Sequence, residues 1–82
     1  MITGTQIKTA RVLLGWSVPD LARRTGINIA DIQDLESMAK VPNRRRNNLE
    51  LIQAILEEAG IEFIESVGVQ FRPKELEASF AE

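Results

Sequence analysis

The sequence of 82 residues contains neither cysteine nor histidine. Their absence excludes disulfides, thiolate nucleophiles and imidazole bases, and it also excludes the usual zinc sites, whose ligands are cysteine and histidine. The residues that are present show no pair of nucleophile and base, no phosphate-binding glycine loop and no cluster of metal ligands. We therefore expect a protein that is not an enzyme and that carries no cofactor and no metal.

Long apolar runs are lacking as well. No stretch reaches the roughly 20 apolar residues that a membrane-spanning helix requires. The first residues show no charged segment followed by an apolar core, which a secretory signal would have. The sequence therefore predicts a cytoplasmic protein with no membrane partner. A chain of 82 residues forms one domain, whose single small core is marginal for a monomer.

The net charge of −2 is unevenly distributed along the chain. Residues 1–46 contain eight basic and four acidic residues, whereas residues 47–82 contain two basic and eight acidic ones. Such an asymmetry separates a half that can approach phosphates from a half that cannot. The distribution therefore allows a polyanionic partner for the first half, although the total charge is negative.

The most informative segment begins at Ser17, which is placed to cap a helix. Asp20, three residues later, completes a capping box, and Pro19 is tolerated because the first turn of a helix does not need its amide. Gly26 ends this helix, since a sharp turn needs a left-handed residue and glycine adopts that conformation without a Cβ penalty. Ala22 is small enough to face the point where a second helix crosses.

That second helix begins directly after the turn. Asn28 is a good N-cap, and Ile27 and Ile32 have the spacing of a hydrophobic staple. Ile32 and Leu35 supply its buried stripe, so the opposite face is directed to solvent. The two helices together predict a helix-turn-helix.

Two further helices, followed by a segment whose residue pattern is that of β-strands, complete the expected fold. Residues 5–14 predict a first helix that ends at Gly15, and Asn47 with Glu50 forms another capping box for a fourth helix that ends at Gly60. The inward positions of the fourth helix are apolar: Leu49, Ile52, Ile55, Leu56 and Ala59. The segments IEFIE and VQF, rich in β-branched and aromatic residues, predict a short hairpin within 61–72, and the tail 73–82 is either a short helix or disordered. We thus expect a mainly α fold with a helix-turn-helix domain over 1–60, a hairpin over 61–72 and a tail over 73–82.

The segment TGTQIKTARVLLGWS followed by VPDLARRTGINIADIQDLE resembles the phage-repressor-like helix-turn-helix domains of the Xre/Cro type. LEEAGIEF followed by VQFR is similar to short bacterial regulators of this family in which a small β element replaces the final helix. The resemblance covers about three quarters of the chain. It implies a transcriptional regulator, namely a dimeric repressor that inserts residues 29–37 into the major groove of a double-stranded DNA operator.

The resemblance also implies which residues contact DNA. Arg11 and Glu36 occupy positions where such domains often have an ion pair near the DNA backbone. Gln33 can pair with an adenine edge, and Asp34 can accept from cytosine N4. The base-reading positions are Asn28, Ile29, Ala30, Gln33 and Asp34, and the expected phosphate contacts are Arg11, Ser17, Arg23, Arg24, Asn43, Arg44, Arg45 and Arg46.

The predicted hairpin gives a route to a homodimer. A short core with a two-stranded hairpin is marginal alone, and the edge of such a hairpin invites pairing with a second copy. The strands close either the core of one chain or an interface between two. The residues expected at the dimer contact are Ile61, Phe63, Val69 and Phe71.

Three residues depart from the family pattern. Val18 stands where these domains often have a glutamine that hydrogen-bonds the DNA, and Asp31 and Asp34 put negative charge near phosphates. These departures favour the alternative function, a protein-interaction module of the same fold that does not bind DNA, such as an antiactivator or an antitoxin-like partner.

Overall fold

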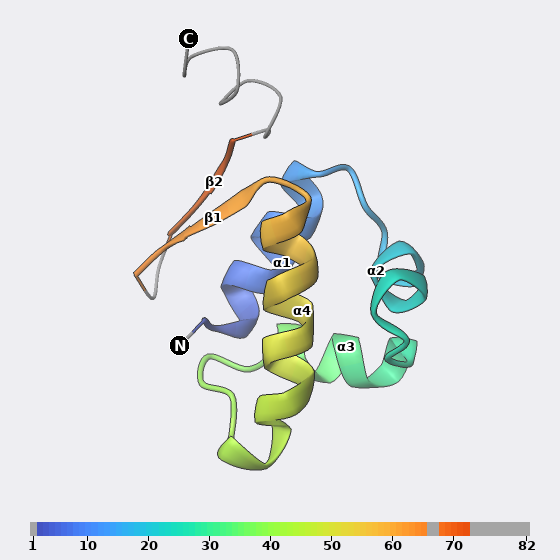
Figure 1. Cartoon of the computed structure of the whole chain (residues 1–82). Coiled ribbons are helices and arrows are strands. Elements are labelled where there is room, and N and C mark those ends of the chain that lie inside the picture. Colours follow the sequence, from blue (N-terminus) through green and yellow to red (C-terminus); the bar gives the residue numbers. More distant parts are fainter. Residues whose placement is uncertain (1, 66–67, 73–82) are drawn as a thin grey trace, which may run out of the picture.

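The computed structural model describes residues 2–65 and 68–72, and the predicted tail lies outside these ranges. The fold is mainly α, with four helices followed by a two-stranded antiparallel hairpin, as predicted (Figure 1). The elements are α1 (Gly4–Leu13), α2 (Val18–Thr25), α3 (Ile29–Glu36), the 3-10 turn η1 (Asn43–Arg45), α4 (Arg46–Glu58), β1 (Ile61–Ile64) and β2 (Gly68–Phe71).

The ends of α2 and the start of α3 confirm the predictions made from local sequence. The side chain of Ser17 accepts from the backbone N–H of Asp20, whose carboxylate accepts in turn from the N–H of Ser17. Gly26 ends α2 in the left-handed conformation with φ of 75°. The side chain of Asn28 caps α3 by accepting from the N–H of Asp31 at 2.8 Å. Local capping therefore determines the limits of this helix pair.

The predicted capping box of α4 is wrong. The helix begins at Arg46, so Asn47 lies inside its first turn, and the N-cap residue Arg45 makes no side-chain capping bond. Glu50 instead accepts from Nε of Arg46 at 2.9 Å. The reason is η1, in which the N–H of Arg45 donates to the carbonyl of Pro42, so the backbone is already coiled before Asn47.

A single apolar core lies between the four helices. Ile7 and Ala10 of α1 are fully buried, and Leu14 packs at the edge of the core. Of the inward positions predicted for α4, Ile55 and Ala59 are only half-buried, whereas the other three are fully buried. The buried apolar residues are Ile2, Ile7, Ala10, Leu21, Ile27, Ile32, Leu35, Val41, Leu49, Ile52, Leu56 and Ile61.

The hairpin closes one side of this core. Ile61 pairs with Phe71 and Phe63 with Val69 across the two strands, so these four residues share one face. Ile61 belongs to the core, and Phe63 and Val69 pack against it. In Figure 1 the hairpin crosses beside the upper end of α4 and runs along α1.

Gln6 joins the hairpin to the start of α1. Its side chain is 1% exposed, and its Oε1 accepts from the backbone N–H of Thr3 at 2.8 Å. Its Nε2 donates to the carbonyl oxygens of Glu65 at 2.9 Å and Gly68 at 3.0 Å. One buried amide therefore satisfies both the first turn of α1 and the two ends of the hairpin turn.

A close approach of two backbones joins α1 to the end of α3. The N–H of Gly4 donates to the carbonyl of Met38 at 3.0 Å. A Cβ atom on Gly4 would lie 2.0 Å from the carbonyl oxygen of Leu35 and 2.5 Å from that of Met38. Only glycine fits at this contact.

No helix within residues 2–65 and 68–72 has the length and apolar character that crossing a membrane requires.

Candidate nucleic-acid interface

The turn between α2 and α3 fixes the outward direction of α3. Oγ1 of Thr25 donates to the carbonyl of Leu21 at 2.8 Å and accepts from the N–H of Ile27 at 3.2 Å. Leu21, Ile27 and Ile32 are buried on either side of this turn. One side of α3 is thereby held in the core, and the opposite side is left to solvent.

All five predicted base-reading residues are exposed on or beside α3. Asn28 is committed to the cap, because its amide also donates to Oδ2 of Asp31 at 3.0 Å. The side chain of Gln33, by contrast, makes no hydrogen bond within the described part of the chain. Ile29 is 43% exposed although it is apolar. The residues most available for base contacts are therefore Ile29, Ala30, Gln33 and Asp34.

Arg11 and Glu36 form the expected ion pair, which is nearly buried. Nε and Nη2 of Arg11 donate to the two carboxylate oxygens of Glu36 at 2.8 and 3.1 Å, and Nη1 donates to the carbonyl of Trp16 at 2.8 Å. The side chains are only 12% and 7% exposed. Since each nitrogen of Arg11 already has an acceptor inside the chain, this geometry argues against the predicted phosphate contact of Arg11. Its role is to hold the end of α3 to α1.

Two of the predicted phosphate-binding cations lie in the last turn of α2. Arg23 pairs with Asp20, and the guanidinium of Arg24 lies 4.1 Å from the ring centre of Trp16, a cation–π contact. The pKa of the Asp20 carboxyl is lowered from its ordinary value of 3.8, chiefly by the backbone N–H of Ser17, then by its hydroxyl, and least by Arg23. Ser17, Arg23 and Arg24 all remain exposed, so these contacts leave them accessible to a phosphate.

The basic segment formed by η1 and the first residue of α4 contains three arginines in different environments. Arg46 pairs with Glu50, whereas Arg44 is exposed and makes no ion pair with a described residue. Arg45 is half-buried, and its Nη2 lies 3.7 Å from Oδ2 of Asp34. Asn43 is exposed at the start of η1. The arginine triplet is therefore three distinct groups, of which Arg44 is the most available.

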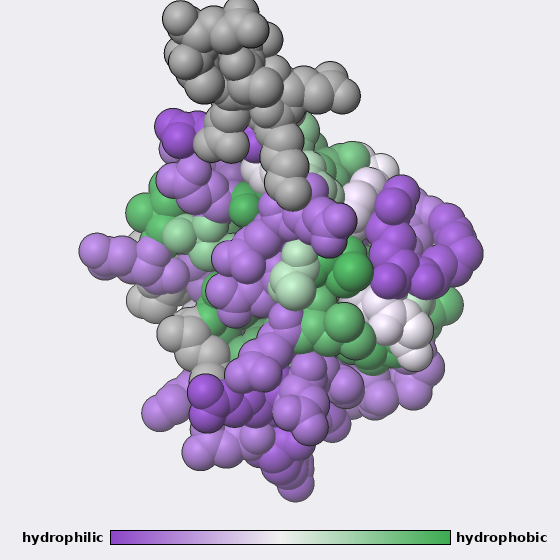
Figure 2. Space-filling view, viewed as in Figure 1, coloured by the Kyte–Doolittle hydropathy of each residue, from purple (hydrophilic) through white to green (hydrophobic). Residues whose placement is uncertain are grey.

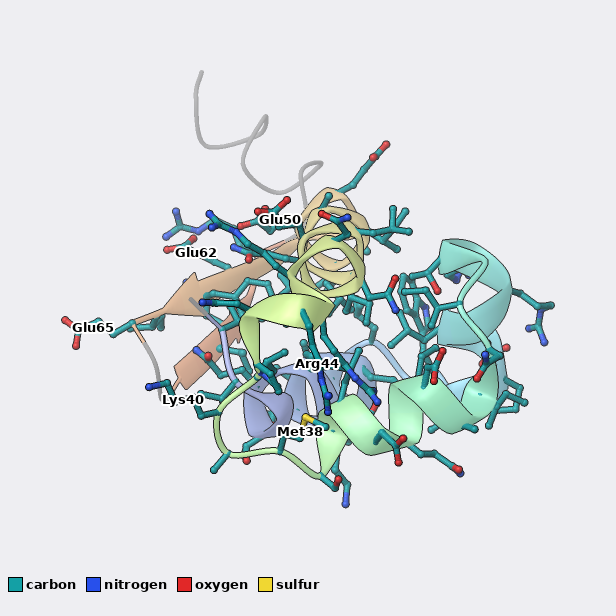
Figure 3. All side chains as sticks on the ribbon, turned by 90° about the horizontal axis from the view of Figure 1, so that it is seen from below. Met38, Lys40, Arg44, Glu50, Glu62 and Glu65 are labelled. Atoms are coloured by element: carbon teal, nitrogen blue, oxygen red, sulfur yellow. The ribbon has the colours of Figure 1, made fainter. Side chains whose placement is uncertain are left out.

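A surface cavity of about 410 Å³ separates α3 from the start of α4. Figure 3, seen from below, shows Arg44 between these two elements. Asn47 and Asn48 were not predicted to belong to a site, because the sequence pattern assigned Asn47 to a helix cap. The lining residues are Asp31, Arg44, Arg45, Asn47 and Asn48.

The surface differs between the two ends of α4. In Figure 2 the lower end of the molecule, around the start of α4, is covered by hydrophilic side chains, whereas apolar side chains show higher up between α4 and α2. The polar end is the one that carries α3 and the basic segment (Figure 1). Hydrophilic side chains thus cover the end of the molecule where α3 and the basic segment lie.

The predicted dimer residues lie on the inner face of the hairpin. Ile61 is 3% exposed, and Phe63 and Val69 are half-buried and pack against the core of the same chain, so most of the surface of these three side chains is covered within the chain. Phe71 is 44% exposed. The alternation of residues is as expected, and the inner face packs against the core of its own chain, with β2 beside α1 and β1 beside α4. Ile64 is equally exposed, and each strand has one edge that pairs with no other strand within the described residues.

No protein-family model matches this chain, and no curated protein is significantly similar to it. Within the described residues, no group of three or more acidic, cysteine or histidine side chains is arranged to hold a metal ion.

Proposed function

We propose that this chain is a sequence-specific DNA-binding transcriptional regulator of the Xre/Cro type, acting as a repressor by placing α3 in the major groove. One observation supports the proposal most directly. The exposed side of α3 presents Ala30, Gln33 and Asp34, while its other side is anchored in the core by Ile32 and Leu35. A short helix held in this way can enter a groove without losing its own packing.

The exposed groups have the chemistry that base edges require. The free amide of Gln33 can bond the N6 and N7 positions of adenine, and Ile29 and Ala30 can pack on thymine methyl groups. Arg44, with Arg23 and Arg24, supplies the cations for phosphates, whose neutralisation provides much of the affinity. We further propose that two copies meet at an outer edge of the hairpin, since a two-stranded sheet has two unpaired edges.

Gln33→Ala tests whether α3 reads bases. A preferred site is first selected from random duplexes with the parent protein. Light scattering on the same preparation measures whether the protein is a monomer or a dimer. The substitution is expected to weaken binding to that site by about 1 to 3 kcal/mol and to leave binding to random DNA almost unchanged. Gln53→Ala, which removes a glutamine amide from α4, outside both α3 and the hairpin, is the matched control and should bind as the parent does. Equal losses on both kinds of DNA would contradict base reading by Gln33.

Arg44→Ala tests the phosphate contact. The affinity for all sequences should fall together, and the slope of log K against log salt should become shallower by about 0.9 for the lost contact. Gel shifts at a series of salt concentrations measure this slope. Lys8→Ala, which removes an exposed cation from α1, should leave the slope as it is. An unchanged slope for Arg44→Ala would make this arginine an ordinary solvated residue.

A second function remains, and one observation favours it. Asp34 is a carboxylate in the middle of the exposed side of α3, and Val18 offers no hydrogen-bond donor at the start of α2. Such a face suits a protein partner with basic side chains as well as it suits DNA. If the parent protein binds no duplex even at low salt, the partner-binding module becomes the better account of this fold.

A further inference from the structure

The side chains of Asp34 in α3 and Arg45 in η1 lie close together, although they belong to two different elements. Nη2 of Arg45 is 3.7 Å from Oδ2 of Asp34, which is an ion pair but too long for a hydrogen bond. The carboxylate side chain is 61% exposed, whereas that of the arginine is 24% exposed. The carboxylate is therefore the accessible member of the pair, and the guanidinium is largely covered.

The guanidinium of Arg45 is incompletely satisfied in this position. Its Nη1 is buried and has no hydrogen-bond partner in the part of the chain that the structure describes. A buried N–H without an acceptor is unfavourable, so Arg45 is not held by a full set of bonds as Arg11 is. Among the described residues, Asp34 is the carboxylate with which it forms an ion pair.

This arrangement has a consequence for a groove-binding helix. A carboxylate among phosphates is repelled, and a neighbouring cation reduces that repulsion. If Arg45 were removed, the charge of Asp34 would oppose every DNA sequence. With Arg45 in place, Asp34 can enter the groove, but it still needs a donor in front of it, and in the major groove the amino group of cytosine is such a donor.

We propose that Asp34 and Arg45 act as a coupled pair that sets specificity at one base pair. Asp34 selects cytosine over bases that present only acceptors, and Arg45 is the positioning residue that makes a carboxylate tolerable there. The inference rests on the proposed DNA binding and deepens it. Asp34 then increases selectivity because it lowers the affinity for random DNA.

A double-mutant cycle tests the coupling. Binding to the selected site and to random duplex is measured at one salt concentration for the parent, Asp34→Asn, Arg45→Gln and the double variant. Arg45→Gln should weaken site binding by about tenfold in the parent and by about threefold or less when Asp34 is already Asn, because the carboxylate that needed the cation is gone. Asp34→Asn should increase affinity for random DNA and remove the preference for cytosine at a single position of the selected site.

The controls separate the possible failures. Arg44→Gln, alone and with Asp34→Asn, should show additive effects, because Arg44 makes no ion pair with Asp34 in the described structure. Urea denaturation of every variant establishes that all are folded. Additive effects of Asp34 and Arg45, or an unchanged base preference in Asp34→Asn, would overturn the pair while leaving DNA binding intact. A folded parent that binds no DNA would overturn both this inference and the proposed function.

Discussion

Glu36→Ala is expected to lower the free energy of unfolding by about 3 to 5 kcal/mol, since it leaves a buried charge without its partner. Arg11 would keep its bond to the carbonyl of Trp16 but would lose both carboxylate oxygens in a site where water has little access. A small domain has a total stability of about 5 to 15 kcal/mol, so the variant should be close to unfolding at moderate temperature. Urea denaturation followed by circular dichroism measures the loss.

Two comparisons make this expectation specific to the buried pair. Arg23→Ala breaks the exposed pair with Asp20 and should cost about 0 to 1 kcal/mol, because solvent screens such pairs. The double variant Arg11→Met with Glu36→Leu should recover much of the loss, since a buried ion pair can often be replaced by apolar side chains of similar size. A cost below about 1 kcal/mol for Glu36→Ala would show that the pair contributes no more than a surface contact.

Gly4→Ala is expected to destabilise the protein by about 3 kcal/mol or more, although alanine is the better residue for a helix. An added methyl group would meet backbone oxygen atoms of Leu35 and Met38 at 2.0 and 2.5 Å, and neither can move as the end of a side chain can. The helix start would have to withdraw from the end of α3. Thermal denaturation should therefore show a large decrease in Tm.

The neighbouring position supplies the control for that substitution. Thr5 is exposed in the same turn of α1, so Thr5→Ala should be neutral or slightly stabilising by helix propensity. A Gly4→Ala variant as stable as Thr5→Ala would mean that α1 and the end of α3 do not approach as closely as the structure indicates.

Sequence reasoning predicts best where the determinants are local. Ser17, Gly26 and Asn28 act through bonds to residues three or four positions away, and both ends of α2 and the start of α3 follow from them. The start of α4 was predicted incorrectly because Asn47 and Glu50 have the spacing of a capping box, while the 3-10 turn before them has no comparable signal. The spacing of Asn47 and Glu50 does not show at which of two possible residues the helix begins.

Contacts between residues that are far apart in the sequence could not be derived from the pattern of apolar and charged residues. Alternation in the hairpin shows that Ile61, Phe63 and Val69 share a face, but it does not show that this face covers the chain's own helices. In the candidate site, Asp34 and Arg45 were both recognised as charges near DNA, one unfavourable and one favourable. That they meet depends on the angle between α3 and the segment before α4, which is set by the whole core.

The amide of Gln6 has a consequence for how this chain unfolds. It bridges the hairpin turn and the first turn of α1, next to the point where Gly4 is bonded to Met38. The hairpin therefore cannot open locally without leaving the buried amide of Gln6 short of acceptors and uncovering the site of Ile61. We therefore expect the helices and the hairpin to unfold together, so that a fragment that stops at the end of α4 is less stable than one that extends through β2.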